Sequence, residues 1–140
     1  MAAVPGLSDE SEPLLPEDLS AILQFLPQFE HPDFSPGSVV AEEGHLPWFD
    51  YSRSVDEFVQ ALYKHKFIVM FDWGCWQDEA IEYYNDPERM ANADLPTLRR
   101  ILTLHVRKER FCAGHLEEMF ESGHIVAVLR RLQDIAGTYG

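Results

Sequence analysis

The side chains best suited to bind or transform a ligand lie in a tract near the C-terminal end of the sequence. Residues 105–132, about a fifth of the chain, hold five of the 11 Lys/Arg residues and three of the six histidines. Arg107 and Arg110 flank a predicted corner between two helices, where planar guanidinium groups are suited to grip a carboxylate or a phosphate through paired hydrogen bonds. The tract therefore predicts a surface that binds an anionic partner or ligand.

A structural role for the same arginines is the alternative. The carboxylates of Glu117, Glu118 and Glu121 follow closely in the sequence, and cations are favourable beside the free carbonyl groups at the C-terminus of a helix. Under this interpretation Arg107 and Arg110 would be paired within the fold and would have no spare hydrogen-bonding capacity.

A histidine or a glutamate recurs at every third residue after this corner. Neighbours three residues apart lie on one side of a helix, where such pairs can ligate a transition metal or serve as acid and base. A zinc site would need further ligands that the sequence does not identify, so we expect no metal and no cofactor. His115 and Glu118 remain candidate ligand- or partner-binding residues. The full pattern is His115, Glu118, Glu121 and His124.

Three helices over residues 94–136 are expected to position these groups. Asp94 is a predicted N-cap, and Pro96 suits the first turn of the helix that follows. Gly114 and Gly123 bracket a short second helix, because a left-handed cap position disfavours a side chain. The third helix turns Arg131 outward, which adds Arg131 to the candidate binding residues.

The first of these helices has two distinct faces. Its apolar stripe includes His105, which favours a hydrogen-bonded core histidine over a general base. The arginines fall within an arc of about 100° on the opposite side, at about 100° per residue, and are expected to face outward. They are Arg99, Arg100, Arg107 and Arg110.

The N-terminal half carries weaker signals. Residues 1–15 are predicted to form a disordered acidic tail, and a single helical domain is expected over residues 16–140. Residues 30–53 are expected to be irregular, and a capping box at Ser54 and Glu57 predicts the next helix. The apolar run Phe67–Phe71 fits either a short strand or a buried helical turn, with Trp48–Tyr51 as its candidate pairing partner.

Together these patterns predict a mainly α fold. We expect a small single-domain helical bundle with a C-terminal tri-helical unit and room for one short β-hairpin. A chain of 140 residues is long enough for one domain with a real core.

The net charge of the chain and its distribution limit which classes of partner it is expected to bind. The net charge is -13, but residues 1–60 hold 12 acids and one base, whereas residues 99–140 hold seven bases and five acids. The overall field disfavours nucleic acid and anionic membranes. No apolar run is long enough to span a membrane, and the acidic N-terminus does not resemble a secretory leader, so we expect a cytoplasmic protein.

Two motifs in the basic tract carry a resemblance. The order Arg-x-x-Arg-Phe-x-x-Gly-x-Leu, followed by Gly-x-Ile-x-x-x-Leu-Arg-Arg-Leu, is similar to a family of small bacterial proteins described only as a domain of unknown function. Phe71-Asp72-Trp73 with Trp76 is also similar, and the likeness covers roughly residues 46–132. It implies a bacterial cytosolic single domain and no catalytic roles. The motif residues are Arg107, Arg110, Phe111, Gly114, Leu116, Gly123, Ile125, Leu129, Arg130, Arg131 and Leu132.

Two functions follow from these features. The favoured one is a non-enzymatic interaction or regulatory module whose arginine corner binds an acidic protein partner or a second copy of the chain. The alternative is a small enzyme or ligand-binding protein that acts on an anionic phosphate or carboxylate, with His115 or Glu118 as acid or base.

Overall fold

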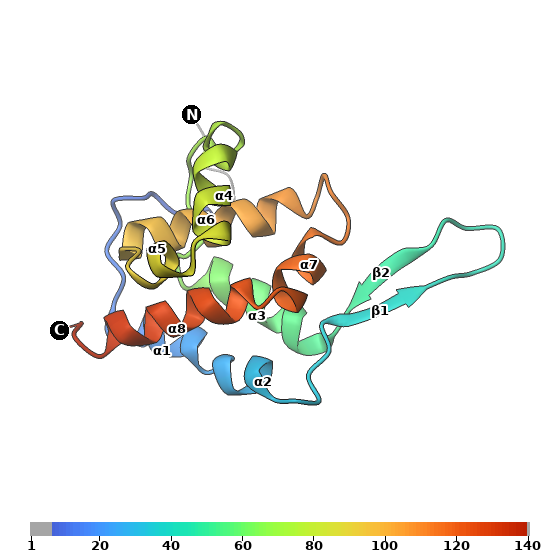
Figure 1. Ribbon diagram of the computed structural model, residues 1–140, viewed down its shortest axis with the longest axis horizontal. Coiled ribbons are helices and arrows are strands. Elements are labelled where there is room, and N and C mark those ends of the chain that lie inside the picture. Colours follow the sequence, from blue (N-terminus) through green and yellow to red (C-terminus); the bar gives the residue numbers. More distant parts are fainter. Residues whose placement is uncertain (1–6, 140) are drawn as a thin grey trace.

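The computed structural model describes residues 7–139 and shows a mainly helical fold with one antiparallel hairpin, as the sequence predicts (Figure 1). The hairpin projects from one end of the helical body. In chain order the elements are α1 Pro16–Leu23, α2 Leu26–Glu30, β1 Gly37–Val40, β2 Trp48–Tyr51, α3 Arg53–Lys64, the 3₁₀ turn η1 Trp73–Trp76, α4 Gln77–Asn85, α5 Pro87–Ala91, α6 Leu95–Lys108, α7 His115–Glu121 and α8 His124–Ala136.

Helices α6, α7 and α8 are the predicted tri-helical unit. The carboxylate of Asp94 accepts a hydrogen bond from the amide of Thr97 at 2.9 Å, so the predicted N-cap of α6 is confirmed. Along α6 and α8 the side chains at the centre of each apolar stripe are fully buried, and each such side chain stabilises the fold by about 2 kcal/mol. The fully buried members include Leu98, Ile101, Leu102, Ile125, Leu129 and Leu132.

Helix α8 lies at the centre of the packing. It contacts α1, α2, α5, α6 and α7, which places the N-terminal helices α1 and α2 on one side of it and α5 and α6 on the other (Figure 1). Among the described residues, no helix combines the length and apolarity required to cross a bilayer.

The segment before α1 takes part in the fold. Ser8 forms a parallel bridge with Val69, and its amide and carbonyl bond to the backbone of Ile68 and Met70. The carbonyls of Glu10 and Glu12 accept hydrogen bonds from Arg99. This differs from the disordered tail expected over residues 1–15, of which residues 1–6 lie outside the described part.

The hairpin joins two segments of the region expected to be irregular. Trp48–Tyr51 pairs with Gly37–Val40 and not with its candidate partner Phe67–Phe71. Phe67, Ile68 and Val69 are instead buried against α6, where the Thr103 hydroxyl accepts a hydrogen bond from the Val69 amide at 2.9 Å. A short apolar run can be buried by helices as well as by a sheet, and here the helices cover it.

Helix α3 begins two residues earlier than predicted. Ser52, not Ser54, is its N-cap and accepts a hydrogen bond from the amide of Val55 at 3.4 Å. The Glu57 carboxylate pairs with Arg53 at 2.9 Å instead of closing a capping box. The Ser52 amide also bonds to the carbonyl of Pro36, so the end of the hairpin sets where the helix starts.

Candidate functional site

The corner between α6 and α7 is built around one carboxylate. Glu109 accepts hydrogen bonds from the amides of Gly114 at 3.0 Å and Leu116 at 2.8 Å, which satisfies free donors at the start of α7. The Tyr51 hydroxyl donates to the same carboxylate at 2.5 Å and accepts from the Glu117 amide at 3.1 Å. Gly114 adopts a φ of 91°, which lets the chain reverse into α7.

The two predicted arginines of this corner have spare bonding capacity. Within residues 7–139, no ion pair or side-chain hydrogen bond holds Arg107 or Arg110, and the buried Nε of Arg107 has no partner. Phe111 follows with 75% of its surface exposed, and its ring lies 5.9 Å from that of Trp73. We call Arg107, Lys108, Arg110 and Phe111 the basic corner.

Arg99 and Arg100 do not belong to this surface, and the expectation that Arg99 faces outward is wrong. The guanidinium of Arg99 is buried and bonds to backbone carbonyls, while Arg100 pairs with the Glu10 carboxylate at 2.5 Å. The N-terminal segment covers this part of α6, and nothing in the helical periodicity of α6 indicates that covering.

Three histidines meet behind the basic corner. The Nδ1 of His105 lies 2.9 Å from the Nε2 of His115, and the rings of His105 and His124 are 5.0 Å apart at an angle of 86°. The Nε2 atoms of His105 and His124 are buried and have no hydrogen-bond partner within the described residues. We call these three residues the histidine cluster.

Burial keeps the histidine cluster uncharged. Loss of hydration is the main cause that lowers the pKa of all three residues: that of His105 well below its ordinary value, and that of His124 to about 4. The neighbouring imidazoles lower the pKa of His105 further. At neutral pH the bond between His105 and His115 therefore contains one shared hydrogen, donated by one ring and accepted by the other.

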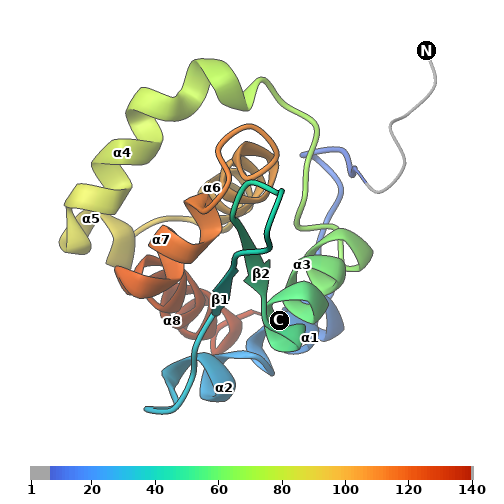
Figure 2. The same ribbon diagram turned by 90° about the vertical axis from the view of Figure 1, so that its right-hand side faces the viewer.

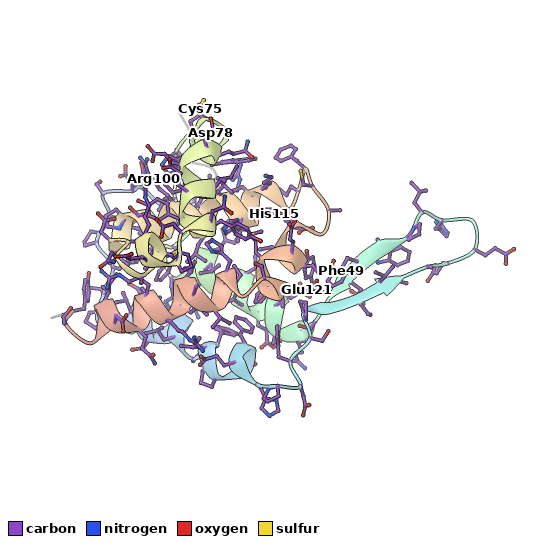
Figure 3. All side chains as sticks on the ribbon, in the orientation of Figure 1. Phe49, Cys75, Asp78, Arg100, His115 and Glu121 are labelled. Carbon is purple, nitrogen blue, oxygen red and sulfur yellow. The ribbon has the colours of Figure 1, made fainter. Side chains whose placement is uncertain are left out.

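Two neighbouring hollows open beside the histidine cluster, and Tyr84 lines both. The smaller, about 210 Å³, lies between α4, α6 and α7 and is lined by His105, His115, Lys108 and Glu118, among others. Figure 3 shows His115 in this region, where α6 ends and α7 begins. The larger, about 400 Å³, is lined by His124, Arg131 and Asp134.

The structure thus divides the five predicted site residues among three places. Arg107 and Arg110 lie at the basic corner, His115 and Glu118 line the smaller hollow, and Arg131 lines the larger one. Arg131 also donates from Nε to the carbonyl of Ala93 at 2.7 Å, which fixes its orientation.

The sequence pattern did not reveal the histidine cluster. His105 precedes His115 by ten residues across a turn whose path the sequence does not specify. The apolar stripe of α6 predicts a hydrogen-bonded core histidine at position 105, as the structure shows, but does not identify its partner. Within residues 7–139, no group of three or more His, Cys, Asp or Glu side chains is arranged to hold a metal ion. The cluster offers hydrogen-bonding nitrogens at the wall of a cleft.

The comparisons with known proteins concern the family alone. No curated protein and no solved structure shows a significant match to this chain. A family model does match, and it extends the likeness noted over residues 46–132 towards both ends of the chain. Its match over residues 14–138 shows that the chain belongs to a family of unknown function, DUF6508.

Proposed function

We propose that this protein is a non-enzymatic interaction module that binds an acidic partner at the basic corner. The observation that carries the proposal is the pair of arginines that have no carboxylate partner within residues 7–139 and lie beside an exposed phenylalanine. Arginine and aromatic side chains supply most of the binding energy in many interfaces, since they combine charge-assisted hydrogen bonds with large apolar area.

The surrounding charge makes such a surface selective. The chain carries a net charge of -13, yet Arg107, Lys108 and Arg110 lie within four residues of one another. Glu109, the acid among them, is already engaged by two amides and the Tyr51 hydroxyl. A partner with acidic and aromatic side chains would meet attraction at the corner and repulsion over much of the remaining surface.

Nuclear magnetic resonance of the labelled protein tests this function. Titration with a synthetic peptide of alternating glutamate and tryptophan should shift the amide signals of residues 107–114, and raising the ionic strength to about 0.5 M should weaken binding. The Arg107→Glu/Arg110→Glu variant should lose these shifts, whereas Lys64→Glu/Arg89→Glu, with the same change in charge, should retain them. Shifts that persist in the corner variant, or that fail to appear, would contradict the proposal.

A second candidate function is favoured by the histidine cluster. Neutral imidazole nitrogens, Lys108 and Glu118 face one hollow, and Arg131 faces the other. The smaller hollow suits a small carboxylate or phosphate that accepts hydrogen bonds, with His115 or Glu118 as the acid or base of a small enzyme.

Thermal unfolding with phosphate, citrate and nucleotides checks this alternative. A ligand present at a hundred times its dissociation constant stabilises the folded state by about 2.7 kcal/mol, which raises the melting temperature by several degrees. The shift should vanish in His115→Gln for a ligand in the smaller hollow or in Arg131→Gln for a ligand in the larger one, and it should persist in Arg89→Gln. Unchanged melting temperatures with every compound would remove the support for a small ligand.

A further inference from the structure

The hairpin exposes apolar side chains that the fold does not use. Val39 is 67% exposed, Leu46 88% and Trp48 44%. A two-stranded hairpin by itself is marginally stable in water, and solvent-exposed apolar side chains add nothing to its stability. The hairpin is thus well suited to be covered by another surface.

Its charge is the complement of the basic corner. Residues 37–51 include Glu42, Glu43 and Asp50 and contain no lysine or arginine. The basic corner offers three cations and an exposed phenyl ring, so the acidic and apolar hairpin complements it in both charge and polarity.

Both surfaces lie on one side of the molecule. The root of the hairpin touches the corner through the hydrogen bond between Tyr51 and Glu109. From that root the strands extend away from the helical body, so the tip points away from the corner of its own chain (Figure 1). In Figure 2 the hairpin and the turn between α6 and α7 both face the viewer.

This placement is what a closed two-fold dimer requires. When a surface and its complement share one side of a chain, a two-fold axis on that side brings each hairpin against the other copy's corner. Two identical contacts then form, and neither complementary surface is left over for chain growth. A foreign acidic protein would satisfy the corner alone and would leave the apolar hairpin without a role.

We propose that the acidic partner of the basic corner is the hairpin of a second copy, exchanged reciprocally in a two-fold dimer. This inference rests on the proposed function and names its partner. Glu42 and Glu43 pair with Arg107 and Arg110 across the interface, and the exposed Leu46 in the connection between the strands packs against Phe111 and Trp73.

Charge reversal tests the pairing, with molecular mass measured by light scattering over a concentration series. The wild-type chain should dimerise. Two variants should each raise the dissociation constant of the dimer by on the order of a hundredfold, because like charges then face each other. They are Arg107→Glu/Arg110→Glu and Glu42→Lys/Glu43→Lys. Mixing the two variants should restore a dimer, as should one chain that carries all four substitutions. The matched variant Lys64→Glu/Arg89→Glu should dimerise like the wild type.

A second variant removes the hairpin without altering charge. Gly37 has a φ of 151°, and a Cβ at this position would lie 2.1 Å from the carbonyl oxygen of Asp50, so Gly37→Ala should disrupt the strand pairing. The helical circular dichroism should persist while the dimer is lost.

The outcomes separate this inference from the function on which it rests. A wild-type chain that stays monomeric at every concentration, or a Glu42→Lys/Glu43→Lys variant that still dimerises, would overturn the exchanged-hairpin dimer. Peptide binding at residues 107–114 would in that case still support a corner that recognises a foreign acidic partner. An Arg107→Glu/Arg110→Glu variant that keeps both the dimer and the peptide binding would overturn both.

Discussion

Replacing Arg99 by methionine is expected to lower the free energy of unfolding by about 3 kcal/mol, because three partly buried carbonyl groups lose their charged donor. The side chain is 5% exposed. It donates to the carbonyl of Lys66 at 2.6 Å and 3.1 Å, and to those of Glu10 and Glu12 at 3.2 Å and 2.8 Å. Lys66 has a φ of 68°, an uncommon conformation for a residue with a side chain, and its carbonyl is one of the groups held.

Urea unfolding followed by circular dichroism measures this loss. Arg100→Met is the matched control, since Arg100 bonds to the Glu10 carboxylate and both side chains are more than one-third exposed. A partly exposed pair of this kind contributes about 0.5 kcal/mol. Equal midpoints for the two variants would show that Arg99 does not anchor the N-terminal segment.

The second large effect is a loss of folding stability at acidic pH. Stability should fall as the pH is lowered from about 6.5 towards 4, and the neutral histidine cluster is the cause. The pKa of His124 is lowered to about 4 in the folded protein from an ordinary value of 6.5, so the unfolded chain binds more protons throughout that interval. Above pH 6.5 the contribution is fully present, and His124 alone accounts for a loss of about 3 kcal/mol once the pH reaches its folded-state pKa.

Urea midpoints measured between pH 7.5 and 5 check the slope. His124→Gln should flatten it, because glutamine does not titrate, and His105→Gln should act in the same direction. His31→Gln is a suitable control, since the ring of His31 is 61% exposed. A His124 ring that titrates near pH 6.5 in the folded protein, measured by magnetic resonance, would refute this account.

The sequence predicts best those elements whose signals are local. Asp94 caps α6, and Gly114 and Gly123, both with positive φ, precede α7 and α8. The same helices bury their apolar stripes as periodicity requires. Caps and stripes depend on residues within a few positions of one another, so they can be recognised without knowledge of the tertiary structure.

Predictions that depended on distant segments succeeded less often. The strand partner of Trp48–Tyr51 lies eleven positions earlier, in a segment that was expected to be irregular. The helical periodicity of α6 predicts an exposed Arg99 side chain, but the chain around Glu10 and Glu12 covers it. The contact between His105 and His115 depends on the path of the turn that joins their helices, which Glu109 and Tyr51 fix.

The phenol of Tyr51 gives the hairpin a direct influence on the cleft. It joins the last residue of β2 to the first turn of α7, and His115 is the residue at which α7 begins. Burial and the hydrogen bond to Glu109 raise the pKa of Tyr51, so the phenol keeps its proton at physiological pH. A single hydroxyl group therefore connects the end of the hairpin to the amide of Glu117 and to the carboxylate that caps α7. We expect a partner bound to the hairpin to change the environment of the His115 imidazole through this connection.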